Sequence, residues 1–211
     1  MFRSDSLFAR FMNVLGDVLL AGILWLIASL PIVTAGSAAT AGYYAMSKSV
    51  MHKTGYLWKE FIHSFKGNLK QSLGITIGYL AVILVLGLDL WYVWNNDSKL
   101  NNAVFVILVF VLFMVAGIGI YIWPLLSRFE KKNLDLLKTA FVVAFRYLPL
   151  TLGLVFFLAV CLVGVYLMPW AVLVIPGVYI YVLTFPMEWI LKKMMPMPEE
   201  GSEEAEKWYY Q

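Results

Sequence analysis

The sequence predicts an all-α fold, a polytopic bundle of transmembrane helices. Of its 211 residues, 62% are hydrophobic and only 14% are charged, with a mean hydropathy of +0.79, whereas about a quarter of the residues of a typical soluble domain are charged. Five apolar runs come near or exceed the ~20 residues that a helix needs to cross a bilayer. No segment alternates apolar and polar residues as a barrel strand does. Because lipid offers no hydrogen-bond partner to the backbone, each run is predicted to be helical.

The predicted spans follow one another along the chain, with one ambiguous segment between the first two. Residues 35–46 are weakly hydrophobic and include Gly36 and Gly42, which let helices approach closely. This segment is either a sixth, protein-packed span or an interfacial or re-entrant helix. The five strong spans are residues 14–33, 72–94, 103–127, 148–167 and 170–191.

The lysine and arginine residues predict the orientation, because cytoplasmic loops of membrane proteins are enriched in them. Two loops hold most of these cations, so both loops are predicted to be cytoplasmic. Lys192 and Lys193 place the C-terminus on the same side. Arg3 and Arg10 do the same for the N-terminus, which requires an even number of crossings and favours six spans over five. The loop cations are Lys48, Lys53, Lys59, Lys66 and Lys70 in the first loop, and Arg128, Lys131, Lys132, Lys138 and Arg146 in the second.

One domain followed by a tail is expected. Residues 1–193 form one integral membrane domain, since no linker or low-complexity run divides them. Residues 194–211 form an acidic tail, which we expect to be disordered in the cytoplasm. Its acids are Glu199, Glu200, Glu203, Glu204 and Glu206.

Each basic loop contains a predicted amphipathic helix at the cytoplasmic membrane surface. The two helices either dock a partner protein or anchor the loops to anionic lipid, and the sequence leaves both readings open. The apolar stripes are Trp58, Phe61, Phe65 and Leu69 in the first helix, and Leu134, Leu137, Phe141, Phe145 and Leu148 in the second. The candidate docking cations are Lys59, Lys66 and Lys70, followed by Lys131, Lys132 and Lys138.

Asp89 is the candidate polar site among the acids that lie near the predicted spans. No lysine or arginine lies within a helical turn of Asp89, and Trp91 and Trp94 follow it closely. These residues could line an outward-facing vestibule for a sugar or a cation, or Asp89 could be hydrated at the interface or bonded to another helix. Glu188, by contrast, lies one turn before Lys192, and that spacing predicts a solvent-screened ion pair.

Residues for catalysis are scarce. His52 and His63 are the only histidines and Cys161 is the only cysteine, so a hydrolytic metal site lacks ligands. The sequence contains no phosphate-binding loop, nucleophile elbow or zinc-protease helix, and no basic nucleic-acid-binding fold. We therefore expect a protein without enzymatic activity, cofactor, metal or nucleic-acid partner. Cys161 is predicted to be a small buried hydrophobic residue.

Several strings along most of the chain carry a family resemblance. They are SLPIVTAG at residues 29–36, GYLWKEF at 55–61, FKGNLKQ at 65–71, LDL at 88–90, PLLSRFE at 124–130 and LP at 148–149. Together they resemble the YesL-like family of small bacterial membrane proteins. The first string and the one at 124–130 are the most specific.

The resemblance implies a biological setting and leaves the activity open. The YesL-like family has no established function or catalytic residues, occurs mainly in Gram-positive bacteria and is often encoded beside carbohydrate ABC transporters and sensor kinases. We therefore expect a plasma-membrane protein that assists or regulates carbohydrate ABC import or its sensing. It would contact a permease or a sensor kinase through its basic helices and the small-residue face at 36–42. The alternative is a small stand-alone transporter or channel with Asp89 at the mouth of its pathway.

Overall fold

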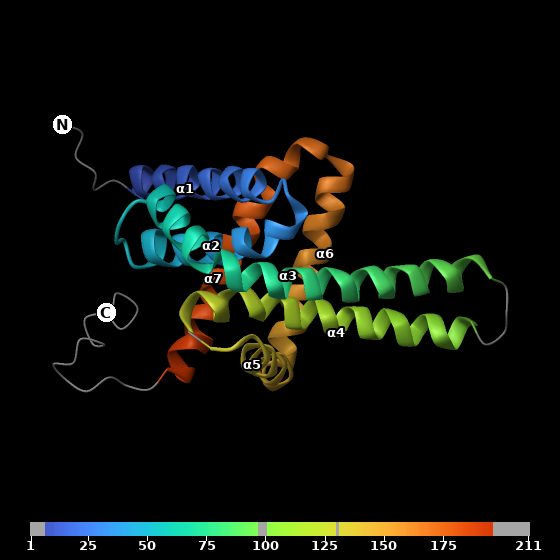
Figure 1. The fold of residues 1–211 in the computed structure, drawn as a ribbon. Helices are drawn as coiled ribbons and strands as arrows, with labels where there is room; N and C mark the ends of the chain where they lie inside the picture. Colours follow the sequence, from blue (N-terminus) through green and yellow to red (C-terminus); the bar gives the residue numbers. More distant parts are fainter. Residues whose placement is uncertain (1–6, 97–100, 130, 196–211) are drawn as a thin grey trace.

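A computed structural model describes residues 7–96, 101–129 and 131–195 (Figure 1), with side chains described from residue 11 onward except at residue 101. Within these ranges the protein is helical almost throughout and has no strand. Three short elements connect the helices: the 3-10 helices η1 (Ile32–Thr34) and η3 (Pro169–Leu173), and the π-helix η2 (Ser47–Met51). The α-helices are α1 (Leu7–Ala28), α2 (Ala35–Met46), α3 (Leu57–Asn95), α4 (Asn101–Arg128), α5 (Asn133–Arg146), α6 (Leu148–Leu167) and α7 (Ile175–Met194).

In the part of the chain that the structure describes, four helices are long and apolar enough to cross a membrane and overlap four of the predicted runs, which confirms the membrane-helix character. They are α1 over Phe11–Ala28, α3, α4 over Asn102–Arg128, and α6. The fifth run, residues 170–191, is divided between η3 and α7. Helix α7 is not among the four, because its C-terminal turns carry Glu188, Lys192 and Lys193.

Proline and glycine set several helix boundaries. Pro149 and Pro176 lie in the first turns of α6 and α7. Backbone N–H groups of a first turn have no acceptor within the helix, so proline, which lacks this group, loses no hydrogen bond there. Pro31 lies between α1 and η1. Gly55 has a φ of +82° just before α3, a backbone conformation that side chains with a Cβ rarely adopt. The chain therefore reverses at Gly55, between η2 and α3.

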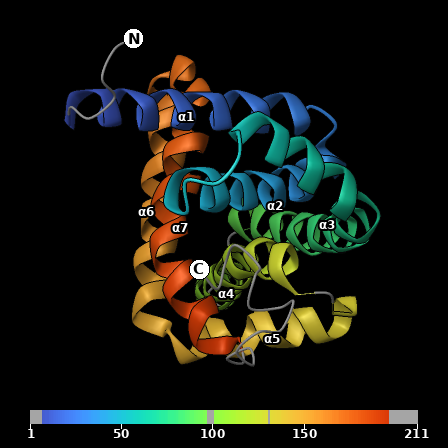
Figure 2. The same cartoon turned by 90° about the vertical axis from the view of Figure 1, so that its left-hand side faces the viewer.

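Helix α2 lies inside the bundle, packed against α1, α3, α4 and α7 (Figure 2). Its 12 residues span about 18 Å at the usual helical rise, less than the ~30 Å of a bilayer core. A Cβ at Gly36 would lie 2.1 Å from Thr76 Oγ1, and a Cβ at Gly42 would lie 2.8 Å from Ile180 Cδ1. Residues 36–42 are thus a packing seam within the chain. Because this face is buried, the expectation that it contacts a partner protein is wrong.

The first predicted amphipathic helix is the beginning of α3, which continues without interruption into the apolar span. Leu57 and Phe61 are buried in one cluster with small residues of α2 and with the middle of α1, and Ser64 is buried on the same face of α3. Trp58, assigned to the same apolar stripe as Phe61, is exposed. The predicted stripe is therefore only partly correct, because the face of α3 that packs against α2 is rotated about the helix axis from the predicted one.

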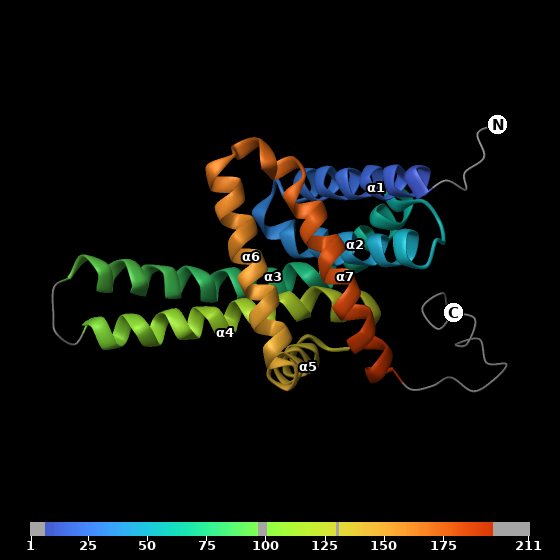
Figure 3. The same cartoon turned by 180° about the vertical axis from the view of Figure 1, so that it is seen from behind.

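The distal parts of α3 and α4 form a hairpin that extends past the other helices (Figures 1 and 3). Helix α3 has 39 residues, which corresponds to about 58 Å. Only its first half and the last half of α4 contribute buried residues to the hydrophobic core. Trp94 and Phe105 touch across the hairpin, with ring centroids 5.8 Å apart.

Helices α6 and α7 cross the direction of α3 and α4 (Figure 3), and α7 packs against α1 through glycine. A Cβ at Gly177 would lie 1.9 Å from the Val18 carbonyl oxygen, and a Cβ at Gly22 would lie 2.7 Å from the Leu173 carbonyl oxygen. The two helix backbones therefore touch directly. This contact fixes the C-terminal helix on the N-terminal one.

Helix α5 packs against α4 and α6 and has two different apolar faces. Leu136, Ala140 and Val143 are buried against the core. The predicted apolar stripe faces outward instead, with Leu134 71% exposed and Phe141 51% exposed. This outward stripe remains available to lipid or to a partner protein, the two alternatives that the sequence leaves open.

Candidate functional site

A buried ion pair joins three distant segments of the chain. Arg128 ends α4, Glu188 lies in the C-terminal half of α7, and Ser47 opens η2. The Arg128 guanidinium donates to a Glu188 carboxylate oxygen, and both side chains are almost inaccessible, with 1% and 6% of their surfaces exposed. We call Tyr43, Ser47, His52, Arg128 and Glu188 together the ionic centre.

Hydrogen bonds from α2 and η2 complete the ionic centre. The Tyr43 hydroxyl donates to Glu188 Oε1 at 2.8 Å, and the Ser47 hydroxyl donates to the same oxygen. Arg128 Nη2 also donates to Ser47 Oγ at 3.0 Å. One carboxylate oxygen therefore accepts from three side chains, on α2, η2 and α4. This convergence offsets the desolvation that a buried carboxylate would otherwise suffer.

His52 borders the ionic centre on the loop that follows η2. Its Nε2 lies 3.7 Å from Glu188 Oε2. Burial lowers the pKa of His52 below its ordinary value, assisted by the positive charges of Lys192 and Arg128, although the charge of Glu188 acts in the opposite direction. His52 is therefore neutral at pH 7 and becomes charged only in acid.

Sequence reasoning missed this centre. We expected Glu188 to pair with Lys192 and treated Arg128 as a loop cation, but Glu188 is buried against Arg128, while Lys192 is exposed. The reason is the rotation of α7, whose buried face carries Thr184 and Leu191 together with Glu188. The helical spacing of these three residues was the available signal.

An apolar cavity of about 340 Å³ lies beside the ionic centre, between α1, α2, α3, α4, α6 and α7. Trp25, Tyr79, Trp123 and Tyr179 give it an aromatic lining, and Tyr43 connects it to Glu188. The Tyr79 hydroxyl donates to the Val115 carbonyl at 3.2 Å. The cavity can therefore hold an apolar or amphipathic molecule but offers few polar contacts.

Two further groups on the cavity wall are notable. Cys161 lines the cavity and is buried, which confirms its prediction as a small buried hydrophobic residue. The Tyr179 hydroxyl is buried and makes no hydrogen bond within the described part of the chain. Among the described residues, no cluster of three or more histidine, cysteine or acidic side chains could hold a metal ion.

The predicted polar site lies far from the ionic centre. Asp89, Trp91 and Trp94 are near the tip of the α3/α4 hairpin and all three are exposed. Helical periodicity places Asp89 and Trp91 on different faces of α3, and Trp94 turns toward Phe105 of α4. The structure thus does not gather these three side chains around one opening in the protein.

The six predicted docking lysines all lie on the surface. Those of α3 form one stripe opposite its buried face, and those near α5 lie before or on that helix. Lys59 Nζ lies 5.3 Å from the centroid of the Tyr56 ring, and Lys131 Nζ lies 5.1 Å from that of Phe129. The six are Lys59, Lys66, Lys70, Lys131, Lys132 and Lys138.

Comparison with known proteins provides one match. Residues 18–90 match the family described as "Protein of unknown function, DUF624". The matched part begins in α1 and ends within α3, so it includes α2 and the lysine stripe of α3 but neither Arg128 nor Glu188. No curated protein and no solved structure matches the chain. The similarity therefore adds no activity, substrate or partner.

Proposed function

We propose that the chain is an accessory or regulatory integral membrane protein that docks a partner through the lysine surfaces of α3 and α5. The observation that carries this proposal is that the six lysines lie on, or directly before, two helices which the core holds in place. Leu57 and Phe61 anchor α3, and Leu136 and Ala140 anchor α5. A fixed array of cations favours an acidic partner surface and discriminates against a basic one.

A direct contact also relates the two lysine surfaces to each other. The Gln71 side-chain amide of α3 donates to the Lys131 carbonyl at 2.6 Å. Gln71 follows Lys70, and Lys131 belongs to the second lysine group. A partner that binds both groups therefore meets cations with a defined spacing.

The proposal includes a topology with six crossings of a bacterial plasma membrane and both chain ends in the cytoplasm. In Figure 1, α2 returns alongside α1 toward the end where α1 begins, and α3 starts from that same end. Helix α2 is too short to cross alone, so we propose that η2, which continues it directly, completes this protein-packed return crossing and that α7 is the last crossing. The lysine surfaces and the ionic centre then lie toward the cytoplasm.

The partner we propose is the permease of a carbohydrate ABC importer or its sensor kinase. This setting rests on the resemblance of SLPIVTAG at residues 29–36 and PLLSRFE at 124–130 to the YesL-like family. The second string ends beside Arg128, so it includes a residue of the ionic centre. That position supports a structural role for residues 124–130, because the ion pair of Arg128 with Glu188 joins α4 to α7.

The first test is crosslinking in the native host, followed by purification in detergent and mass spectrometry. We expect a transporter permease or a sensor kinase to be recovered in near-equal amount. Changing Lys59, Lys66 and Lys70 together to glutamate should remove the partner and reduce sugar uptake, because the surface charge is reversed while all three positions are exposed.

The matched control changes the same three lysines to arginine. This variant keeps the charge and the exposure, so partner recovery and sugar uptake should stay close to the unmodified protein. Membrane abundance of all variants is measured in parallel. If glutamate at these positions leaves uptake and crosslinking unchanged at equal abundance, docking through α3 is refuted.

A second candidate function, a stand-alone transporter for a small solute, is favoured by the cavity described above. The cavity is separated from the cytoplasmic end by Tyr43 and its bond to Glu188, an arrangement that could open and close. Its apolar lining favours an amphipathic solute over a free sugar.

Flux into liposomes that contain the purified protein tests this alternative. Ala39→Leu would fill part of the cavity, whereas Val106→Phe adds volume at an exposed position on the hairpin. A transporter should lose flux in the first variant and keep it in the second. Absence of flux for every solute tested, or equal flux in both variants, would reject this function.

A further inference from the structure

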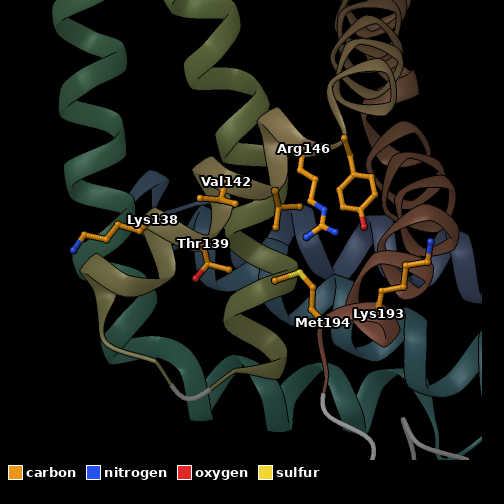
Figure 4. Close-up of a pocket in the computed structure, with 8 residues that line it drawn as sticks. Lys138, Thr139, Val142, Arg146, Lys193 and Met194 are labelled. Carbon is orange, nitrogen blue, oxygen red and sulfur yellow. The ribbon is translucent and has the colours of Figure 1, made fainter.

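A groove with a basic lining runs between α5 and the end of α7 (Figure 4). Its volume is about 520 Å³. The Arg146 side chain points into the space between the two helices, whereas the Lys138 side chain extends away from α7. We call this feature the basic groove, lined by Lys138, Thr139, Val142, Val143, Arg146, Tyr147, Lys193 and Met194.

No carboxylate neutralises these cations within the described part of the chain. Lys138, Arg146 and Lys193 form no ion pair there, whereas the neighbouring Arg128 and Lys48 do. Asp135 is the one acid of α5, and it lies three turns before Arg146, about 16 Å along the helix. The two cations nearest the space between the helices, Arg146 and Lys193, therefore create a positive potential that favours an anion there.

Aromatic rings hold two of the cations in position. Lys193 Nζ lies 3.6 Å from the centroid of the Trp189 ring, and the Arg146 guanidinium lies 6.0 Å from that of Tyr147. Trp189 and Tyr147 themselves meet edge to face, with centroids 5.7 Å apart. In membrane proteins, tryptophan and tyrosine are enriched at the level of the lipid headgroups. This pair therefore indicates that the groove lies at headgroup level.

Exposed apolar surface continues from the basic groove onto the outer face of α5. Val142 lines the groove and is 59% exposed. Phe141 and Phe145 follow on the adjoining face, in contact with each other at 4.6 Å between centroids. A ligand with an anionic head and apolar chains would satisfy both surfaces at once, whereas a free anion would leave the apolar surface uncovered.

We propose that the basic groove binds the phosphate of an anionic phospholipid, with Arg146 and Lys193 as its main ligands. The acyl chains then run along the outer stripe of α5. Lipid bound in this way fixes α5 to α7 and therefore sets the orientation of the α5 lysines. The inference does not depend on the identity of any partner protein.

Native mass spectrometry of the full chain tests the site by titration with phosphatidylglycerol or phosphatidylcholine. Phosphatidylglycerol should bind at lower concentration, because phosphatidylcholine has no net charge. Changing Arg146 and Lys193 together to glutamine should weaken phosphatidylglycerol binding by about 30-fold, the loss expected for two interfacial cations. The control, Lys53→Gln, removes an exposed cation that lies outside both the groove and the six docking lysines, and it should leave binding unchanged.

A second variant guards against misfolding. Val142→Asp places a negative charge in the basic groove at an exposed position, and it should also weaken phosphatidylglycerol binding. The inference is overturned if Lys53→Gln weakens binding as much as the Arg146 and Lys193 variant, if Val142→Asp has no effect, or if phosphatidylcholine binds as tightly as phosphatidylglycerol. Displacement of the lipid by an equal concentration of inorganic phosphate would also overturn it, because the groove would then be a site for a free anion.

Discussion

The packed end of the bundle, around the ionic centre, and the distal α3/α4 hairpin are both built from apolar helices, but their surroundings are opposite. At the first, α2 is buried by four other helices, and Glu188 accepts bonds from three side chains. At the second, Leu84 is 64% exposed and Trp94 is 76% exposed. Asp89, the acid of the hairpin, is exposed as well.

This contrast shows where the fold depends on specific contacts and where it depends on its solvent. An exposed apolar surface of this extent is stable only in lipid or beneath another protein. We therefore expect the hairpin to tolerate exchange of one apolar residue for another, whereas its stability should depend on whether detergent or a bilayer surrounds it. The stability of the packed end should instead depend on small substitutions. A buried polar group that loses its partner finds no other, and closely packed backbones leave no room for an added methyl group.

The largest effect is expected at the ionic centre. Arg128→Ala leaves the buried Glu188 without its opposite charge, and removing one partner of such a pair costs about 3–5 kcal/mol. Glu188→Ala should cost a similar amount. The measurement is thermal unfolding of the purified protein in detergent, followed by size-exclusion fluorescence.

The double variant Arg128→Met with Glu188→Leu separates charge from packing. Apolar residues of similar size can replace a buried ion pair with little loss, so the double variant should unfold at a higher temperature than either single alanine variant. If instead the three variants unfold together, the centre contributes through packing and hydrogen bonds to Tyr43 and Ser47 rather than through the charges.

The sequence predicts the membrane class and four of the helices because length and hydropathy are local properties. It does not predict which helix faces meet. Residues 35–46 remained ambiguous because small residues serve equally between helices of one chain and of two. Glu188 was misassigned because Lys192 lies one turn away, while its partner Arg128 is 60 residues distant. The basic groove arises only when α5 and α7 meet.

The second effect concerns the glycine contact between α1 and α7. Gly177→Ala should destabilise the protein by about 1–3 kcal/mol, because the added methyl group meets the Val18 carbonyl and forces the helices apart. Gly78→Ala is the matched control on α3, where nothing lies within 4 Å. It should be neutral or slightly stabilising, since alanine is the better helix former. Equal destabilisation by both would contradict direct backbone packing at Gly177.

A smaller, pH-dependent effect is expected at His52. Because burial lowers the pKa of His52 in the folded protein, the unfolded chain binds a proton more readily. Stability from this group is therefore fully present above the unfolded pKa of about 6.5, and it is lost as the pH falls through that value toward the folded pKa. The unfolding temperature should drop between pH 7 and pH 5, and His52→Gln should reduce that drop. An identical pH profile in the variant would assign the titration to another group.

The smallest effect is expected at the tip of the hairpin. Asp89→Asn preserves size and changes only the charge of an exposed side chain, so the free energy of unfolding should change by no more than about half a kcal/mol. Glu188→Gln, the same chemical change at the buried end, should cost much more, because Arg128 then lacks a charged partner. Parallel unfolding of the two variants in detergent and in nanodiscs makes the comparison direct. A large loss in Asp89→Asn that occurs only in the bilayer would show that the hairpin tip makes a polar contact in the membrane, and it would return Asp89 to the candidates for a pathway.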